Sequence, residues 1–105
     1  MKFVFAYHGG SMPETDEEMQ ATMTAWGDWM GGLGDALLDP GNPTAQSATV
    51  GPDGSVAQDG GVNPVTGYSL VEAADLAAAT EMAKGCPILA AGGSVEVAQT
   101  VDIPM

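Results

Sequence analysis

The order of strand and helix signals along the chain constrains its fold more than any other feature. Residues 3–7 form a β-rich apolar run, and a long helical pattern follows it. A short strand or turn starts near Leu37, and residues 68–71 read as a further strand. A second helix and a last strand at residues 94–98 complete the order β-α-β-β-α-β.

This order predicts an α+β fold, the ferredoxin-like split β-α-β sandwich, in a single domain spanning residues 1–105. Two helices cover only one face of such a sheet, yet residues 3–7 are apolar at both parities. Val4 and Ala6 would then lie bare on the other face. A monomer rarely exposes several hundred Å² of apolar sheet, so we expect a homodimer that packs sheet against sheet, a dimeric α/β barrel.

The first helix carries a clear start signal. Thr15 and Glu18 fit a capping box after Pro13, and the acidic first turn suits the helix dipole. Apolar residues then recur at spacings of four and three, which predicts one buried face on a helix that runs to about Met30 or a little beyond. That stripe consists of Met19, Met23, Trp26, Met30, Leu33 and Leu37.

The middle of the chain predicts a hairpin, and the last third predicts a short helix. Residues 45–50 read as a polar edge strand that pairs with residues 55–57 across a tight turn at residues 52–54. Asp75 is the expected N-cap of the second helix, which should end at Lys84 and Gly85. Its predicted buried side consists of Leu76, Ala79, Met82 and Ala83.

The charge balance excludes several partners. Fourteen acidic residues face only Lys2 and Lys84, for a net charge of -12 and no arginine. Such a chain repels phosphate backbones and anionic lipid, so we expect neither a nucleic-acid nor a membrane partner. Without a guanidinium to bind carboxylate or phosphate, a small neutral ligand is favoured. Salt would screen this self-repulsion, which makes a saline habitat one hypothesis. A separate hypothesis is an acidic partner for a basic protein, whose binding would collapse at moderate salt.

The cysteine count and the hydropathy of the sequence indicate the cellular compartment of the protein. Cys86 is the single cysteine, so no intrachain disulfide can form. No segment approaches the roughly 20 apolar residues of a membrane span, and a cytoplasmic location is expected. No cofactor is indicated. A metal site of His8 with Asp39 lacks any diagnostic spacing, so no metal is predicted.

Three segments of the chain resemble the YCII-related family (YciI-like, or DGPF-type). They are the strand at residues 2–7, the Gly-Tyr-Ser-Leu-Val-Glu-Ala run at residues 67–73, and the Gly-Ser-Val-Glu-Val run at residues 93–97. The resemblance covers nearly the whole chain and implies the dimeric α/β-barrel form of the ferredoxin-like fold. It does not imply one activity, because this superfamily includes isomerases, lyases, monooxygenases and non-catalytic ligand binders.

The chain departs from that family at two motifs. Some members resemble enzymes with a histidine in the first helix and an aspartate before a proline after the second. Here the first helix carries Trp26, and the residue before Pro87 is Cys86. The Asp-Gly-Pro-Phe stretch of another subgroup is replaced at residues 58–64 by Gln-Asp-Gly-Gly-Val-Asn-Pro. The chain therefore resembles a divergent branch.

His8 is the only histidine and the candidate acid or base. It follows the first strand, where it would titrate near neutral pH, or it is a loop residue bonded to backbone. Cys86 follows a helix C-terminus, where the dipole disfavours a thiolate, so burial is the simpler interpretation. Contact between the two side chains is left open. The Gly9-Gly10 pair precedes a helix whose acidic first turn would repel a phosphate.

Two function hypotheses follow. The first is a small-molecule site in each protomer, with His8 for proton transfer of the isomerase or lyase type on a neutral cyclic or phenolic compound. The rival is a non-catalytic homodimeric ligand-binding or interaction module, whose aromatic residues only fill the core. The residues predicted to line the ligand site are Trp26, Met30, Tyr68, Asn42 and Cys86.

Overall fold

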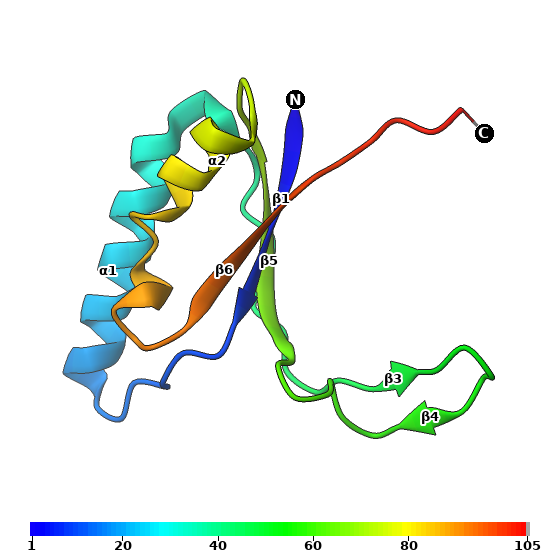
Figure 1. Ribbon diagram of the computed structural model, residues 1–105. Helices are drawn as coiled ribbons and strands as arrows, with labels where there is room; N and C mark the ends of the chain where they lie inside the picture. The colour runs from blue at the N-terminus through cyan, green and yellow to red at the C-terminus, as the bar shows by residue number, and fades with distance from the viewer. Residues whose placement is uncertain (105) are drawn as a thin grey trace.

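The computed structural model describes residues 1–104 and is a mixed α+β structure (Figure 1). Its main elements follow the predicted order, with a small hairpin inserted before the third main strand. In chain order they are β1 (Lys2–His8), α1 (Asp16–Leu33), β2 (Leu37–Asp39), β3 (Thr49–Val50), β4 (Val56–Ala57), β5 (Val65–Glu72), α2 (Leu76–Ala83) and β6 (Ser94–Gln99). Two short 3-10 turns, Gly34–Ala36 and Pro87–Leu89, follow the helices.

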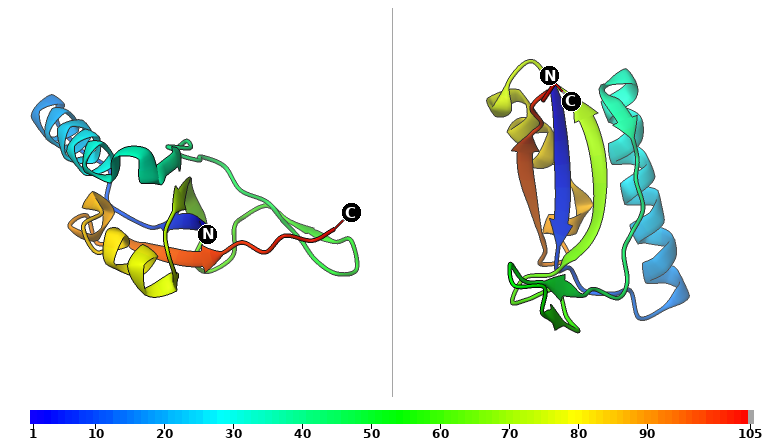
Figure 2. Two further views of the ribbon diagram at one scale, coloured as in Figure 1. Left: turned by 90° about the horizontal axis from the view of Figure 1, so that it is seen from above. Right: turned by 90° about the vertical axis from the view of Figure 1, so that its right-hand side faces the viewer.

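Four strands form one antiparallel sheet in the order β2-β5-β1-β6. The central strand β1 pairs on one side with β5 and on the other with β6, so that Phe5 lies between Ser69 and Val97. Both helices lie on the same side of this sheet (Figures 1 and 2). Within residues 1–104, a single chain therefore has one covered and one uncovered sheet face and forms no barrel.

The core lies between the sheet and the helices. Because side chains alternate along a strand, Phe3, Phe5 and Tyr7 of β1 all point to the helix side and are buried. The Trp26 ring meets the Tyr7 ring edge-on at 5.1 Å, and Trp29 lies 6.1 Å from Phe5. The other buried apolar residues are Val71, Ala73, Ala79, Ala83, Cys86 and Ile88.

Both helices begin as the sequence predicts. The Thr15 hydroxyl accepts a hydrogen bond from the Glu18 amide at 3.1 Å, although the Glu18 carboxylate returns to the amide of Glu14. The Asp75 carboxylate caps α2 by accepting from the Ala78 amide at 2.8 Å. These caps bind amides that have no partner inside the helix, which is why local sequence located them.

Three local predictions need correction. The edge strand expected at residues 45–50 forms only over Thr49–Val50. The hairpin projects away from the main sheet, so within the described residues β4 is the one strand that pairs with β3. Met19 and Met23 of the predicted buried stripe are 44% and 67% exposed, since α1 meets the core only from Trp26 onward. Leu76 is 49% exposed because it is the first residue of α2, at the rim of the helix layer.

Two segments project from the uncovered side of the sheet. We call residues 44–64, which contain β3 and β4, the arm, and residues 101–104, which follow β6, the tail. Figure 1 shows both extending away from the helices, the arm from one end of the sheet and the tail from the other. They raise the radius of gyration to 15.2 Å, compared with about 13 Å for a typical domain of this length.

Candidate functional site

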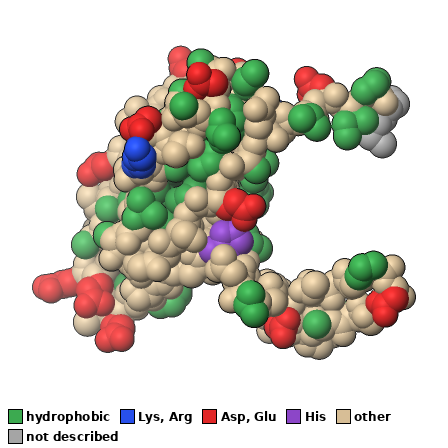
Figure 3. Space-filling view, viewed as in Figure 1, with side chains coloured by type: hydrophobic (Ala, Val, Ile, Leu, Met, Phe, Trp, Pro, Cys, Tyr) green, Lys and Arg blue, Asp and Glu red, His purple; other side chains and the backbone are tan. Residues whose placement is uncertain are grey.

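The uncovered sheet face, which we call the open face, carries apolar side chains with no layer packed over them. The pairing register puts Val4 opposite Leu70 and Ala98, and Ala6 opposite Tyr68, so these side chains share one face. Val4, Ala6 and Leu70 are only half-buried, and Tyr68 is 37% exposed. In Figure 3 the open face forms the concave side of the molecule between the arm and the tail.

His8 lies at the corner of the open face where the arm begins (Figure 3). Its Nδ1 atom is 3.0 Å from the carbonyl oxygen of Asn63 and 3.3 Å from that of Pro64. Its Nε2 atom is 3.1 Å from a carboxylate oxygen of Glu96 on β6. The imidazole therefore connects β1, β6 and the base of the arm.

The surroundings of this ring determine what it can do chemically. Every contact is with an acceptor: two backbone carbonyls at Nδ1 and a carboxylate at Nε2. The imidazolium form donates at both nitrogens, whereas a neutral ring donates at only one. Only 12% of the His8 side chain is exposed, so a substrate would have to displace Glu96, whose side chain is 68% exposed. The geometry suits a latch for the arm better than a free general base.

A second polar group is buried on the helix side of the sheet. The Tyr7 hydroxyl donates to Ser69 Oγ at 2.8 Å, and the Ser69 hydroxyl donates to the carbonyl of Pro40 at 2.7 Å. Burial raises the pKa of Tyr7 to about 12. Sequence reasoning missed this chain of bonds because it depends on the pairing register, which carries no local signal. Its groups are all partnered, so it stabilises the core and offers no free catalytic atom.

Cys86 belongs to the core. Its side chain is buried, and this burial raises the pKa of the thiol to about 11. A thiol that stays protonated at neutral pH is a weak nucleophile. Cys86 packs with the helix-side cluster, whereas His8 lies on the open face, so the two do not form a dyad.

The residues predicted for one ligand pocket lie on both faces of the sheet. Trp26 packs on Tyr7 on the helix side, and Met30 lies on the same helix, half-buried. Tyr68 and His8 lie on the open face. Asn42 is exposed, and only its backbone joins the sheet, by accepting from the Tyr68 amide at 3.3 Å. Within one chain, the sheet itself separates these residues.

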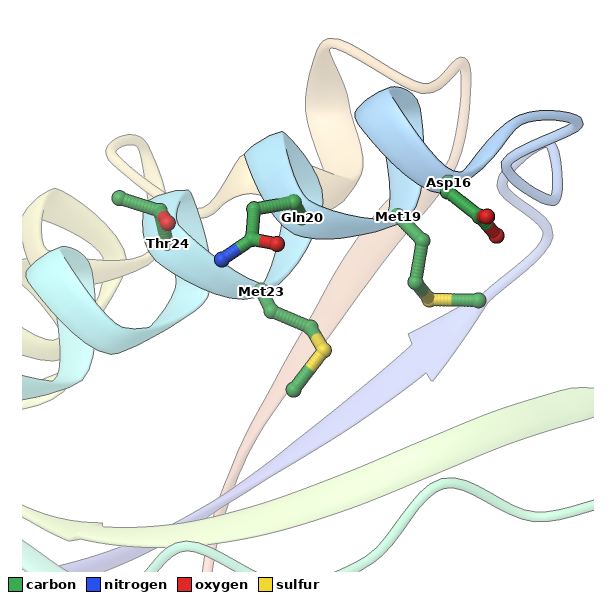
Figure 4. Close-up of a pocket in the computed structure, with 5 residues that line it drawn as sticks. All are labelled: Asp16, Met19, Gln20, Met23 and Thr24. Carbon is green, nitrogen blue, oxygen red and sulfur yellow. The ribbon is translucent and has the colours of Figure 1, made fainter.

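Two hollows on the surface lie away from all of them. One, of about 510 Å³, runs along α1 and is lined by Asp16, Met19, Gln20, Met23 and Thr24 (Figure 4). The other, of about 390 Å³, lies on the arm between residues 45–47 and 58–60. Both are wide open. Within residues 1–104, no three His, Cys, Asp or Glu side chains gather as a metal site would require.

The open face with its His8 corner is therefore the candidate site, and its form is that of an interaction surface. No helix within the described part of the chain combines the length and apolar content needed to cross a membrane. Comparisons of the chain with protein-family models, with curated proteins and with solved structures found no match.

Proposed function

We propose that the chain is a homodimeric ligand-binding or interaction module of the YCII-related kind, in which two ferredoxin-like sheets pack through their open faces. The observation that carries this proposal is the uncovered apolar face. Val4, Ala6 and Leu70 sit at its centre on the two inner strands, β1 and β5. The helices already cover the other face of this sheet, and a monomer rarely leaves a large apolar patch in water, so a face of this kind is normally covered by a further layer.

The exposed area supports the same proposal. A folded monomer of 10.6 kDa exposes about 5,500 Å², whereas this chain exposes 7098 Å². The excess, about 1,600 Å², lies within the range of about 1,000–2,500 Å² that each partner of an obligate dimer buries. A second copy of the chain would remove this excess without any other partner.

The element order supports the family assignment within this proposal. The main strands, taken in chain order, lie second-third-first-fourth across the sheet, which is the arrangement of a ferredoxin-like sandwich. The three segments that resemble the YCII-related family coincide with β1, β5 and β6. These strands form most of the open face, so the family resemblance and the proposed interface involve the same part of the chain.

The proposal is tested by the oligomeric state of two matched variants. Leu70→Lys puts a charge at the centre of the open face, and Leu89→Lys makes the same change at a 43% exposed residue on the helix side. In sedimentation velocity at about 1 M NaCl, which screens the net charge of -12, we expect dimers for the wild type and Leu89→Lys. We expect monomers for Leu70→Lys. A wild type that stays monomeric at 100 μM protein refutes the proposal.

A second candidate function rests on the His8–Glu96 pair. A carboxylate that contacts an imidazole at 3.1 Å is the arrangement with which acid–base enzymes orient a histidine. A ligand that displaces the exposed Glu96 carboxylate would meet Nε2, which would allow proton transfer on a small neutral cyclic or phenolic compound at the His8 corner, as an isomerase or lyase would carry out.

A thermal-shift screen tests this second function. Neutral aromatic, lactone and phenolic compounds are compared on the wild type and on His8→Asn. Asparagine keeps a donor at the position of Nδ1 but has no group at Nε2. A ligand class that stabilises the wild type and loses its effect with His8→Asn supports the enzyme. Equal responses, or none, leave the non-catalytic module as the better function.

A further inference from the structure

The arm and the tail expose apolar side chains that the single chain does not use. Val50 and Val56 on the arm are 68% and 54% exposed, and Val101 and Ile103 on the tail are 73% and 68% exposed. Val101 and Ile103 alternate with Asp102 in an extended segment, which is the pattern of a strand with one apolar face. Both segments therefore have the chemistry of paired strands.

The arm also lacks a third strand. β3 and β4 have only two residues each, and within the described chain they pair only with one another. An isolated two-stranded hairpin is marginally stable in water, and its outer edges offer unpaired backbone groups. A third strand added to either edge would satisfy these groups and cover the valines.

The geometry of a face-to-face dimer determines what lies beside the arm. Two packed sheets lie about 10 Å apart, and their two-fold axis lies in the plane between them. The arm projects from one end of the sheet and the tail from the other (Figure 1). An axis along the strands would bring both arms to the same end. An axis across the strands would bring each arm beside the tail of the partner.

The second arrangement fits the shape of the chain. Seen toward the open face, the arm projects from beneath the sheet itself and not from beside it (Figure 2). Two arms at the same end would therefore have to share the space below the two sheets, and neither would have a tail beside it. With the axis across the strands, each arm extends past the end of the partner's sheet, where only a thin extended tail lies.

We propose that the tail of each copy adds as a strand to the β3–β4 hairpin of the other, so that the dimer contains two intersubunit three-stranded sheets. This inference rests on the proposed homodimer and specifies its axis. It is strand addition, in which backbone hydrogen bonds provide affinity and alternate side chains provide register. Val101 and Ile103 of one copy would cover Val50 and Val56 of the other.

Cysteine cross-linking tests the arrangement directly. The double variant Val56→Cys with Ile103→Cys is oxidised at about 1 M NaCl, next to each single variant and the wild type. Because Cys86 is buried, the wild type is expected to stay uncross-linked. We expect a disulfide-linked dimer from the double variant, and from a mixture of the two single variants, but little from either single variant alone. The pair Val50→Cys with Val101→Cys covers the alternative register.

A second measurement does not depend on disulfide geometry. The variant Val101→Ser with Ile103→Ser should raise the dimer dissociation constant about tenfold or more, because two apolar contacts are lost at each end of the dimer. Met12→Ser removes a 79% exposed methionine in the loop between β1 and α1 and should leave the dissociation constant unchanged.

The outcomes separate this inference from the proposed function. A dimer that cross-links through Val56→Cys alone, with no arm–tail product and no effect of the tail variant, overturns the inference and leaves the homodimer intact. A wild type that is monomeric overturns both. Arm–tail cross-links in a dimer that Leu70→Lys dissociates support both.

Discussion

Replacing His8 should release the base of the arm while the sheet stays folded. The ring connects the carbonyls of Asn63 and Pro64 with the carboxylate of Glu96. His8→Ala removes all these contacts. If the ring is a latch, the loss is local, and amides at the arm base become more accessible to exchange with solvent.

The size of the effect follows from the contacts. The two carbonyls share one Nδ1–H group, which amounts to one net hydrogen bond of about 0.5–1.5 kcal/mol. The contact of Nε2 with the exposed Glu96 adds at most about 1 kcal/mol. A total of about 1–2 kcal/mol corresponds to a roughly tenfold faster local opening.

Hydrogen exchange at assigned amides is the assay. The Thr44 amide donates to the Thr66 carbonyl at 2.9 Å where the arm joins β5, and it reports the latch. The Val71 amide lies in β5 between two paired strands and serves as the control. We expect His8→Ala to speed exchange at Thr44 about tenfold and to change Val71 far less.

Two conservative variants distinguish the contacts of the ring. His8→Asn places a donor near the position of Nδ1, and His8→Gln places one near Nε2. If Nδ1 holds the arm, Asn restores slow exchange at Thr44 and Gln does not. Unchanged exchange in His8→Ala, or rescue by Gln alone, would refute the latch.

Three further predictions concern stability. Gly41 has φ +70°, and a Cβ there would lie 1.8 Å from the Tyr68 carbonyl oxygen, so Gly41→Ala should strongly lower the chemical-denaturation midpoint. A Cβ at Gly27 on α1 would meet open space, so Gly27→Ala should raise the free energy of unfolding by about 0.5–1 kcal/mol. Burial raises the pKa of Tyr7 to about 12 and that of Cys86 to about 11, both above their values in the unfolded chain. The free energy of unfolding should therefore be highest below about pH 9 and should fall as the pH rises to about 12. Tyr7→Phe and Cys86→Ala should each make that fall smaller. Raising NaCl from about 0.05 to 1 M should increase the melting temperature by roughly 4–8 °C, since screening weakens the repulsion of a net charge of -12, and a decrease would contradict this.

Local signals predicted the elements of the fold well. Thr15 and Asp75 cap the two helices as expected, and the doubly apolar run at residues 3–7 became the central strand. Each of these signals acts within a few residues of the chain. The homodimer, the barrel and the function stay predictions, because they depend on contacts beyond a single chain.

Contacts between distant parts of the chain, in the core and at the candidate site, were not predictable in the same way. Trp29 lies one position off the apolar stripe of α1, yet it packs on Phe5 and donates a hydrogen bond to the Met82 carbonyl. The register that pairs Ala6 with Tyr68 determines which face Tyr68 occupies, and no local pattern encodes that register. Glu96 meets His8 for the same reason, across strands far apart in sequence.

The two proposed functions are physically linked through the position of His8. The rings of Phe5, Tyr7, Trp26 and Trp29 pack together on the helix side of the sheet, whereas the His8 side chain lies on the opposite face. Any ligand of His8 must therefore approach from the open face. If two open faces pack together, the only access to the ring is at the rim of the interface, past Glu96 and the base of the arm. A ligand would then bind between subunits, and its affinity should depend on protein concentration wherever the dimer dissociates.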